Sequence, residues 1–529
     1  MLEKQLSKKL IDNFNSHNKK IFDHKINKSK NIFLIEFNGW AVIHIIFSYL
    51  VNYFKKEKNC KIVAYEAHDL MNRLDPPKIS KYLWKLGSYF NVRTFKIFKM
   101  FGTDEFIKPK FKNAYFNKSN YTCHLFYSNK PSLRKLESFK LNNVWIGDLI
   151  YDSYLKKFSL PTLDLNTPEF KNFFKKSLML FFFWEEYFKK NHIKGICVCH
   201  AVYLTGIPLR IANSRKIRCF SASNMNLYNL SSSINHKKKI NGSDIEFKYY
   251  EKYFKKFPKE IQKNNIMIGK DIVKDILIGK RKYFYLKKKT YTNIKYKKIK
   301  NTKKLNVVIF SHNFVDSPHI YGNHFFSDFK QWFNFLESII KRTDYNWYIK
   351  DHPTSNEITK NEINDFLQKN QKIKYLSKNF TNNKLLKLGI DYVLTVYGSI
   401  ASEIPAYGIN VISASKNNPH INHSFSINPK NLKDYKKILM NLNKYNKKIN
   451  LTHLYRFHFM KYFLFKNNLF FYDPEKYFIF NKKKPLQFTP KMYEYWLKEF
   501  NLNHHKKIIK NLSRFINSKE YIYFKNEIN

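Results

Sequence analysis

The 529-residue chain is poor in glycine and in acidic residues. It has only 13 glycines beside abundant Lys, Asn, Ile, Phe and Tyr, which indicates a broad compositional bias. Its 40 Asp and Glu residues face 96 Lys and Arg residues, so the net charge is +56. Such a charge attracts polyanions, among them nucleic acids, anionic membranes and phosphorylated substrates. Compositional bias and attachment to an acidic membrane face explain it about equally well.

Cysteine is also scarce, and its spacing excludes two classes of protein. The five cysteines are odd in number and form no CxxC pair. We therefore expect neither a disulfide framework nor a zinc site, and we expect the protein to lie in a reducing compartment. Cys197 and Cys199 alternate in the strand-like segment ICVCH, where we expect both to pack in the core.

The chain lacks a hydrophobic run long enough to cross a bilayer. Its longest apolar stretches, residues 41–54 and 178–184, fall short of the roughly 20 residues that a spanning helix needs. The polar, amphipathic N-terminus does not resemble a signal peptide. We expect a cytoplasmic protein, with peripheral attachment to the inner face of the cytoplasmic membrane left open.

Strand-like and helix-like segments alternate in both halves of the chain, which predicts parallel sheets covered by helices. Short apolar runs mark the strands. They lie at residues 31–37, 61–65, 141–146, 195–199 and 216–222 in the first half, and at 305–311, 347–350, 373–376, 391–396 and 411–414 in the second.

This alternation predicts an α/β protein with two Rossmann-like domains, since the chain is too long for one core. We expect one domain at residues 1–280 and a second at 305–430. The Lys- and Tyr-rich stretch 281–304 is the expected linker, and residues 431–529 form a helical extension.

The segment NWYIKDHP places phosphate-binding groups at the end of a strand. Pro353 holds His352 in an extended conformation, and Lys350 points to the same side two residues earlier. An imidazole and an ammonium there can bind a diphosphate or stabilise a departing phosphate. A turn-forming proline beside a solvated histidine is the alternative.

The strand expected at residues 391–396 ends in a Gly-Ser turn followed by a glutamate. Gly398 lets the backbone approach a ligand, and Ser399 or Ser402 is expected to cap a helix. Glu403, one turn beyond Ser399, offers its carboxylate to ribose hydroxyls; a capped helix with a solvated glutamate is the alternative. Because both motifs lie at the carboxyl edge of one predicted parallel sheet, the sequence predicts a nucleotide site.

Residues 311–324 form a histidine-rich loop after the first strand of this domain. It holds His312, Asp316, His319 and His324, in a spacing that fits no familiar metal pattern. We expect a lid or an acceptor loop, and solvated histidines are an equal alternative.

Residues 307–414 resemble the C-terminal half of bacterial capsular and surface-polysaccharide biosynthesis proteins, a group that includes the Kdo transferases. The resemblance rests on SHNFVDSPHIYG, FFSDFKQWF, WYIKDHP and GSIASEIPAYGINVI, with weaker support from GDLIYD and ICVCHAVY. It implies a GT-B fold, with two domains facing across a cleft and with His352, Ser399 and Glu403 binding the donor nucleotide. Asn410 stands where such sequences often carry proline.

The resemblance implies a glycosyltransferase that moves a sugar from a nucleotide-activated donor to a surface polysaccharide or lipid-linked glycan. By the same resemblance, residues 305–430 are the nucleotide-sugar-binding domain and residues 1–280 are the acceptor domain, which should also hold the general base. Arg210 is expected on a helix surface, with an acidic acceptor as its alternative partner. The candidate bases follow strands or turns and stay unranked: Glu36, Asp148, Asp152 and His200.

No Asp-x-Asp sequence occurs, which argues against a metal-dependent GT-A enzyme, so neither metal nor cofactor is expected. A polyol-phosphate transferase or a sugar-nucleotide epimerase on the same fold remains possible from the sequence. A basic nucleic-acid-binding protein is the alternative of another class, although no zinc-finger spacing or RNP-like motif supports it.

Overall fold

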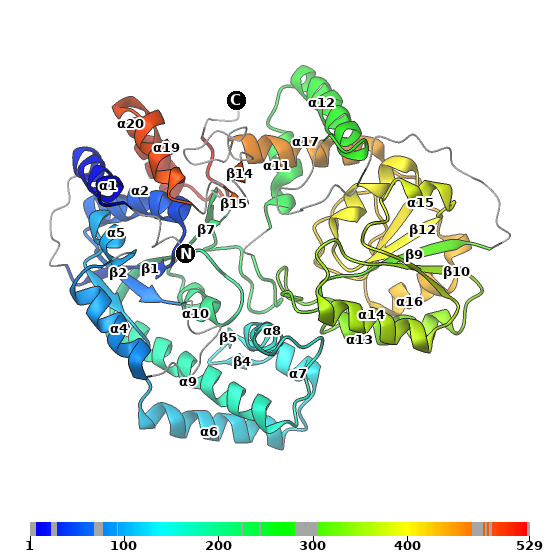
Figure 1. Cartoon of the computed structure of the whole chain (residues 1–529), viewed down its shortest axis with the longest axis horizontal. Coiled ribbons are helices and arrows are strands. Elements are labelled where there is room, and N and C mark those ends of the chain that lie inside the picture. Colours follow the sequence, from blue (N-terminus) through cyan, green and yellow to red (C-terminus); the bar gives the residue numbers. More distant parts are fainter. Residues whose placement is uncertain are drawn as a thin grey trace. The chain divides into compact units, whose positions relative to one another are not determined.

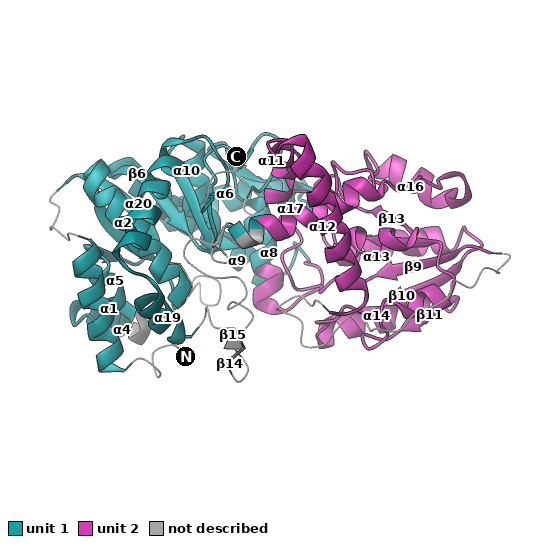
Figure 2. Ribbon diagram, turned by 90° about the horizontal axis from the view of Figure 1, so that it is seen from above, with its two compact units in different colours: residues 1–153, 164–243, 464–527 teal, residues 154–163, 244–463, 528–529 magenta. Residues whose placement is uncertain are grey.

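The computed structural model of the chain forms two compact units (Figures 1 and 2). Unit 1 comprises residues 1–153, 164–243 and 464–527, and unit 2 comprises 154–163, 244–463 and 528–529. The residues described are 7–22, 29–67, 78–92, 94–223, 226–242, 245–280, 291, 304–467, 480–481, 484–485 and 489–525.

Unit 1 is built on a six-stranded sheet in the order β3-β2-β1-β6-β7-β8. All neighbouring strands are parallel except β7 and β8. The strand order reverses between β1 and β6, the place where doubly wound sheets bind ligands. The strands are β1 (Asn31–Phe37), β2 (Lys61–Glu66), β3 (Glu105–Ile107), β6 (His192–Val198), β7 (Arg218–Ser223) and β8 (Asn226–Asn229).

The helices of unit 1 include α2, whose residues 41–54 are all buried. This helix needs apolar residues all round because it lies between the sheet and other helices. The main helices are α1 (Lys8–Ile21), α2 (Ala41–Lys58), α4 (Lys78–Tyr89), α5 (Thr94–Met100), α6 (Asn113–Ser128), α7 (Leu133–Glu137), α8 (Gly147–Phe158, reaching into unit 2), α9 (Pro168–Lys190), α10 (Ile207–Ser214), α19 (Lys491–Glu499) and α20 (Leu502–Asn517).

The strand expected at residues 141–146 is not part of this sheet. The segment instead forms a separate antiparallel hairpin of β4 (Lys140–Leu141) and β5 (Val144–Trp145). Asn142 and Asn143 turn the chain with φ values of 48° and 64°. Asparagine tolerates this left-handed conformation, so two successive asparagines favour a tight hairpin turn.

Unit 2 is built on a five-stranded, all-parallel sheet in the order β11-β10-β9-β12-β13. Its strand order reverses between β9 and β12, so both units have the doubly wound, Rossmann-like topology. The elements are β9 (Asn306–Phe310), α13 (Phe329–Ile340), β10 (Asn346–Lys350), α14 (Glu357–Lys369), β11 (Ile373–Leu376), α15 (Lys384–Lys387), β12 (Tyr392–Thr395), β13 (Asn410–Ser413) and α16 (Leu432–Met440).

The units do not follow the expected boundaries at residues 280 and 430. Helices α11 (Tyr250–Phe254) and α12 (Lys259–Leu277) belong to unit 2, where α12 packs on α17 (Leu451–Asn467). A Cβ at Gly269 of α12 would lie 2.1 Å from the carbonyl oxygen of Tyr455, so glycine permits this close packing.

The last helices of the chain return to unit 1. The Tyr493 hydroxyl lies 2.5 Å from Nδ1 of His44, and the Tyr49 hydroxyl lies 2.6 Å from Nδ1 of His505. These contacts join segments more than 400 residues apart, so no local pattern predicts them. Of the expected linker, only Tyr291 and Lys304 are among the described residues. No described helix is both long and apolar enough to cross a membrane.

Candidate functional site

Lys350 ends β10 at the carboxyl edge of the unit 2 sheet. Its side chain is only 3% exposed, and its ammonium lies 5.7 Å from the centroid of the Phe310 ring. Within the described parts of the chain, no hydrogen bond or ion pair satisfies this ammonium. Burial lowers the pKa of Lys350 to about 8, although the carboxylates of Asp351 and Glu403 favour the charged form. At neutral pH this site therefore holds a buried cation that an anionic ligand can stabilise.

His352 lies two residues beyond Lys350 and is partly buried. Its Nδ1 accepts a hydrogen bond from the Thr354 N–H at 3.2 Å, which leaves Nε2 as the N–H donor of the neutral ring. Burial lowers the pKa of His352, while Asp351 and Asp316 oppose the shift. The ring is thus suited to donate a hydrogen bond to a phosphate oxygen.

The turn after β12 is built on close packing at Gly398. A Cβ there would lie 2.7 Å from the Thr395 hydroxyl oxygen, which itself accepts the Gly398 N–H at 3.1 Å. The helix expected after this turn is replaced by two 3-10 helices, Ser399–Ser402 and Ile404–Tyr407. Pro405 lacks an N–H group and disfavours a continuous α-helix through this segment.

The expected capping role of the two serines is wrong, because neither serine caps these helices. The Ser402 hydroxyl instead donates to the Ser399 carbonyl at 3.0 Å. The Ser399 hydroxyl donates to Oε1 of Glu403 at 2.9 Å. The serines therefore shape the turn and orient the glutamate.

Glu403 is buried rather than solvated. Besides Ser399, it accepts a hydrogen bond at 2.7 Å from the hydroxyl of Tyr291, whose pKa burial and the charge of Glu403 raise well above its usual value. His458 of α17 contacts the same turn, because its Nε2 donates a hydrogen bond to the Ser402 carbonyl at 2.5 Å. Sequence reasoning missed Tyr291 and His458, since neither belongs to a recognisable motif.

The loop after β9 is packed against the strand ends. His312 stacks on Phe329 with centroids 4.5 Å apart, and its Nε2 accepts the Val396 N–H at 3.1 Å. Burial is the main cause that holds the pKa of His312 well below its usual range, and the neighbouring His352 and His324 lower it further. His319 is also buried, whereas Asp316 is exposed. His312 and His319 are thus not the solvated histidines of the alternative.

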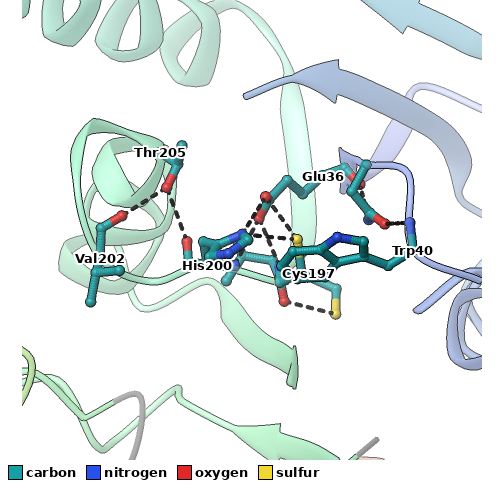
Figure 3. Close-up of polar contacts among 9 residues, drawn as sticks. Glu36, Trp40, Cys197, His200, Val202 and Thr205 are labelled. Carbon is teal, nitrogen blue, oxygen red and sulfur yellow. Dashed lines mark hydrogen bonds and ion pairs between the residues drawn. The ribbon is translucent and has the colours of Figure 1, made fainter. Parts of the chain in front are cut away.

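In unit 1, the strand order brings Glu36 and His200 together at the switch between β1 and β6 (Figure 3). Oε2 of Glu36 accepts the backbone N–H groups of Cys199 at 2.7 Å and His200 at 3.0 Å. Oε1 lies 2.8 Å from the Cys199 sulfur and 3.3 Å from Nδ1 of His200. The His200 ring, 24% exposed, lies 4.7 Å from the Trp40 ring between centroids. Glu36 thereby orients the imidazole.

Hydrogen bonds keep Glu36 charged despite its burial. Burial alone would raise its pKa, but His200 and Cys199 outweigh this effect and hold the pKa below its usual value. With Nδ1 of His200 directed at the carboxylate, Nε2 is the basic nitrogen of the neutral ring. Such a pair has the arrangement of a histidine general base and its orienting acid.

Glu36, Cys199 and His200 are the one group of three described side chains whose ligand atoms, all within 4.8 Å, could hold a metal ion. Burial and the charge of Glu36 raise the pKa of the Cys199 thiol well above its usual value. The thiol therefore stays protonated and donates a hydrogen bond to Oε1 of Glu36. This hydrogen-bonded arrangement satisfies the group without a metal.

The other two candidate bases are placed differently. Asp148 is buried in an ion pair with Arg210 at 2.6 Å, and Arg210, expected at the surface, is itself fully buried against the Trp145 ring. This pair fixes the start of α8 and leaves Asp148 poorly suited to accept a proton. Asp152, also on α8, is buried.

No protein-family model and no curated protein matches the chain, but solved structures do. KpsC from Thermosulfurimonas dismutans, a beta Kdo 2,4 transferase, is 11% identical with a TM-score of 0.30, covering 50% of this chain and 79% of its own. The UDP-GlcNAc 2-epimerase of Neisseria meningitidis, bound to UDP-GlcNAc, is 10% identical with a TM-score of 0.23, covering 82% and 98%. MurG of Acinetobacter baumannii is 11% identical with a TM-score of 0.23, covering 82% and 95%. Likenesses this distant carry no argument about the reaction.

Proposed function

We propose that the protein is an enzyme that binds a sugar nucleotide at the carboxyl edge of the unit 2 sheet. The observation that carries this proposal is Lys350, a buried ammonium that forms no hydrogen bond or ion pair with a described residue, so that no opposite charge is in direct contact with it. A nucleotide diphosphate supplies that charge. His352, in the loop after β10, donates a hydrogen bond to the diphosphate. The Gly398 turn follows β12 of the same sheet.

The reaction we propose is transfer of the sugar to a surface polysaccharide or a lipid-linked glycan. Lys350 and His352 stabilise the departing phosphate, and Nε2 of His200 takes the proton of the acceptor hydroxyl. Glu36 is a positioning residue, because it acts through the imidazole. Glu403 and Ser399 orient the nucleotide, with Glu403 exchanging one of its present hydrogen bonds for a ribose hydroxyl.

The acceptor also accounts for the proposed location at the inner face of the cytoplasmic membrane. A lipid-linked glycan lies at a bilayer surface, and the net charge of +56 favours contact with an anionic leaflet. The sequence motifs that resemble capsular polysaccharide proteins support this choice of acceptor.

Nucleotide binding tests the proposal directly. The parent should show a higher melting temperature with one of CMP, CDP, UDP, GDP or ADP, because the ligand binds only the folded state. Lys350→Met should abolish this response, whereas Lys374→Met, which removes an exposed lysine of β11, should keep it. If none of the nucleotides acts, or if both variants respond like the parent, the site is wrong.

Product analysis with the responding nucleotide sugar then separates transfer from epimerisation. Both reactions begin with the same bound donor, so nucleotide binding alone does not distinguish them. Transfer consumes the sugar nucleotide only when an acceptor is present. Epimerisation converts the sugar without one, and that product would replace the glycosyltransferase proposal by the epimerase.

A further inference from the structure

Helix α4 presents an apolar stripe to solvent. The exposed side chains recur at i, i+4 and i+7, one face of a helix, with a second row one residue further on. Each is between 51% and 77% exposed. The stripe comprises Tyr82, Leu83, Leu86 and Tyr89 of the helix and Phe90 directly after it, whose N–H donates to the Leu86 carbonyl at 2.9 Å.

The other side of α4 holds the helix on unit 1. Trp84 packs against Phe37 and Phe95 with ring centroids 4.9 Å from each. A Cβ at Gly87 would lie 2.7 Å from the Phe95 ring, so the helix is closely seated there. The exposed stripe is therefore not the core face of the helix, because that face is already occupied.

The sequence of α4 and of the segment after it carries charge of one sign. Residues 78–100 contain five lysines, one arginine and no acidic residue, and Lys85 is exposed on the helix itself. Lysine is depleted in the cores of protein–protein interfaces. Lysines beside leucines and aromatic rings instead match a membrane surface, where the rings enter the headgroup region and the ammonium groups meet anionic lipids.

We propose that the apolar stripe of α4 inserts into the headgroup region of an anionic membrane leaflet. The stripe would be the part of the protein that makes the membrane contact of the proposed function. The inference rests on that function only for the purpose of the contact, which is to bring the enzyme to a lipid-linked acceptor. Vesicle binding needs neither donor nor acceptor. Its failure therefore leaves the nucleotide site untouched, and failure of the nucleotide site leaves the stripe untouched.

Vesicle sedimentation tests the inference with the full chain. The parent should pellet with vesicles of phosphatidylcholine and phosphatidylglycerol, and much less with phosphatidylcholine alone. Leu86→Glu and Leu86→Ser should each weaken binding to the anionic vesicles at least tenfold. The matched controls are Met267→Glu and Met267→Ser, at an exposed apolar position of α12, and these should bind like the parent.

The paired substitutions separate apolar insertion from charge. If both glutamate variants weaken binding equally and both serine variants bind like the parent, net charge drives the contact and the stripe is not inserted. Absence of parental binding also overturns the inference. Sedimentation velocity covers the remaining case: a parent that is dimeric without vesicles and a Leu86→Glu variant that is monomeric would assign the stripe to a second copy of the chain. Unchanged melting temperatures confirm that the variants fold.

Discussion

The two sheets reverse their strand order in the same way but carry opposite charges at their carboxyl edges. In unit 1, the buried carboxylate of Glu36 is met by two backbone N–H groups, a thiol and an imidazole. In unit 2, the buried ammonium of Lys350 has no such set of partners among the described residues. At one edge the buried charge is fully hydrogen-bonded, whereas at the other the buried charge is favoured only by its attraction to the carboxylates of Asp351 and Glu403, without a hydrogen bond or ion pair to a described residue. Substitutions at the two edges should therefore act with opposite signs on stability.

The largest expected effect is on the reaction. Glu36→Gln removes the charge that orients His200, so transfer should fall by about 10²- to 10⁴-fold, the usual contribution of a positioned general base. The melting-temperature response to nucleotide should stay, because Lys350 and His352 belong to unit 2. Full activity in this variant would remove Glu36 and His200 from the mechanism.

The buried ion pair of unit 1 should affect stability next most strongly. Asp148→Asn leaves the fully buried Arg210 without its carboxylate, which should lower the free energy of unfolding by about 3–5 kcal/mol. Glu186→Gln, at the more exposed pair with Lys112, should lower the free energy of unfolding much less, because solvent screens exposed ion pairs. Urea denaturation measures both. Equal losses in the two variants would contradict the structural role of Asp148.

At the carboxyl edge of the unit 2 sheet, removal of a buried charge should stabilise the protein instead. Lys350→Met replaces a buried cation by an apolar side chain of similar length. The ligand-free protein should therefore gain about 3 kcal/mol of unfolding free energy, because the pKa of Lys350 is about 8 instead of the ordinary lysine value of 10.5. Nucleotide binding is lost at the same time. Urea denaturation without ligand checks the gain, and a loss of stability would show that Lys350 already has a partner in the folded protein.

The pH dependence of the parent sharpens this point. Because the folded-state pKa of Lys350, about 8, lies below the ordinary lysine value of 10.5, the unfolded chain binds more protons than the folded one between these two pH values. The contribution of this lysine to stability should thus rise with pH across that window, and Lys350→Met should lack the rise. Nucleotide affinity should fall over the same range, because the ammonium loses its proton. A parent and variant with parallel profiles would argue against a buried charge.

The smallest expected effect is that of a chelator. The Cys199 thiol keeps its proton, and Oε2 of Glu36 already accepts two N–H groups. Transfer by the purified enzyme should therefore be unchanged by EDTA. A loss that zinc or magnesium restores would place a metal at Glu36, Cys199 and His200, and would make the two edges alike in needing a ligand.

Local pattern was enough to predict most of the sheets. The strands Asn31–Phe37 and Ile373–Leu376 begin and end where expected, and the alternation of strands and helices predicted that most strand pairs in the two sheets are parallel. Buried strands have apolar sequences, so each of these elements can be recognised from its own segment of the chain. The placement of Lys350, His352 and Gly398 at strand ends follows from the same pattern.

Departures arose where a short polar segment competes between several structures. Two asparagines turned the expected strand at residues 141–146 into a hairpin, and Pro405 replaced a helix by two 3-10 turns. The return of α19 and α20 to unit 1 depends on contacts such as Tyr493 with His44. Amphipathic periodicity shows that a helix will bury one face, but it does not show which partner will cover it.

The sequence by itself determined which side chains stand at strand ends, and it left Glu36, Asp148, Asp152 and His200 as equal candidates for the base. Only the tertiary structure brought Glu36 to His200, across 164 residues, and directed Asp148 to Arg210. It also placed Tyr291 on Glu403 and left Lys350 buried without a described partner. The physical reason is that strand order and burial set the charge environment of a side chain, and both arise from contacts between segments far apart in the chain.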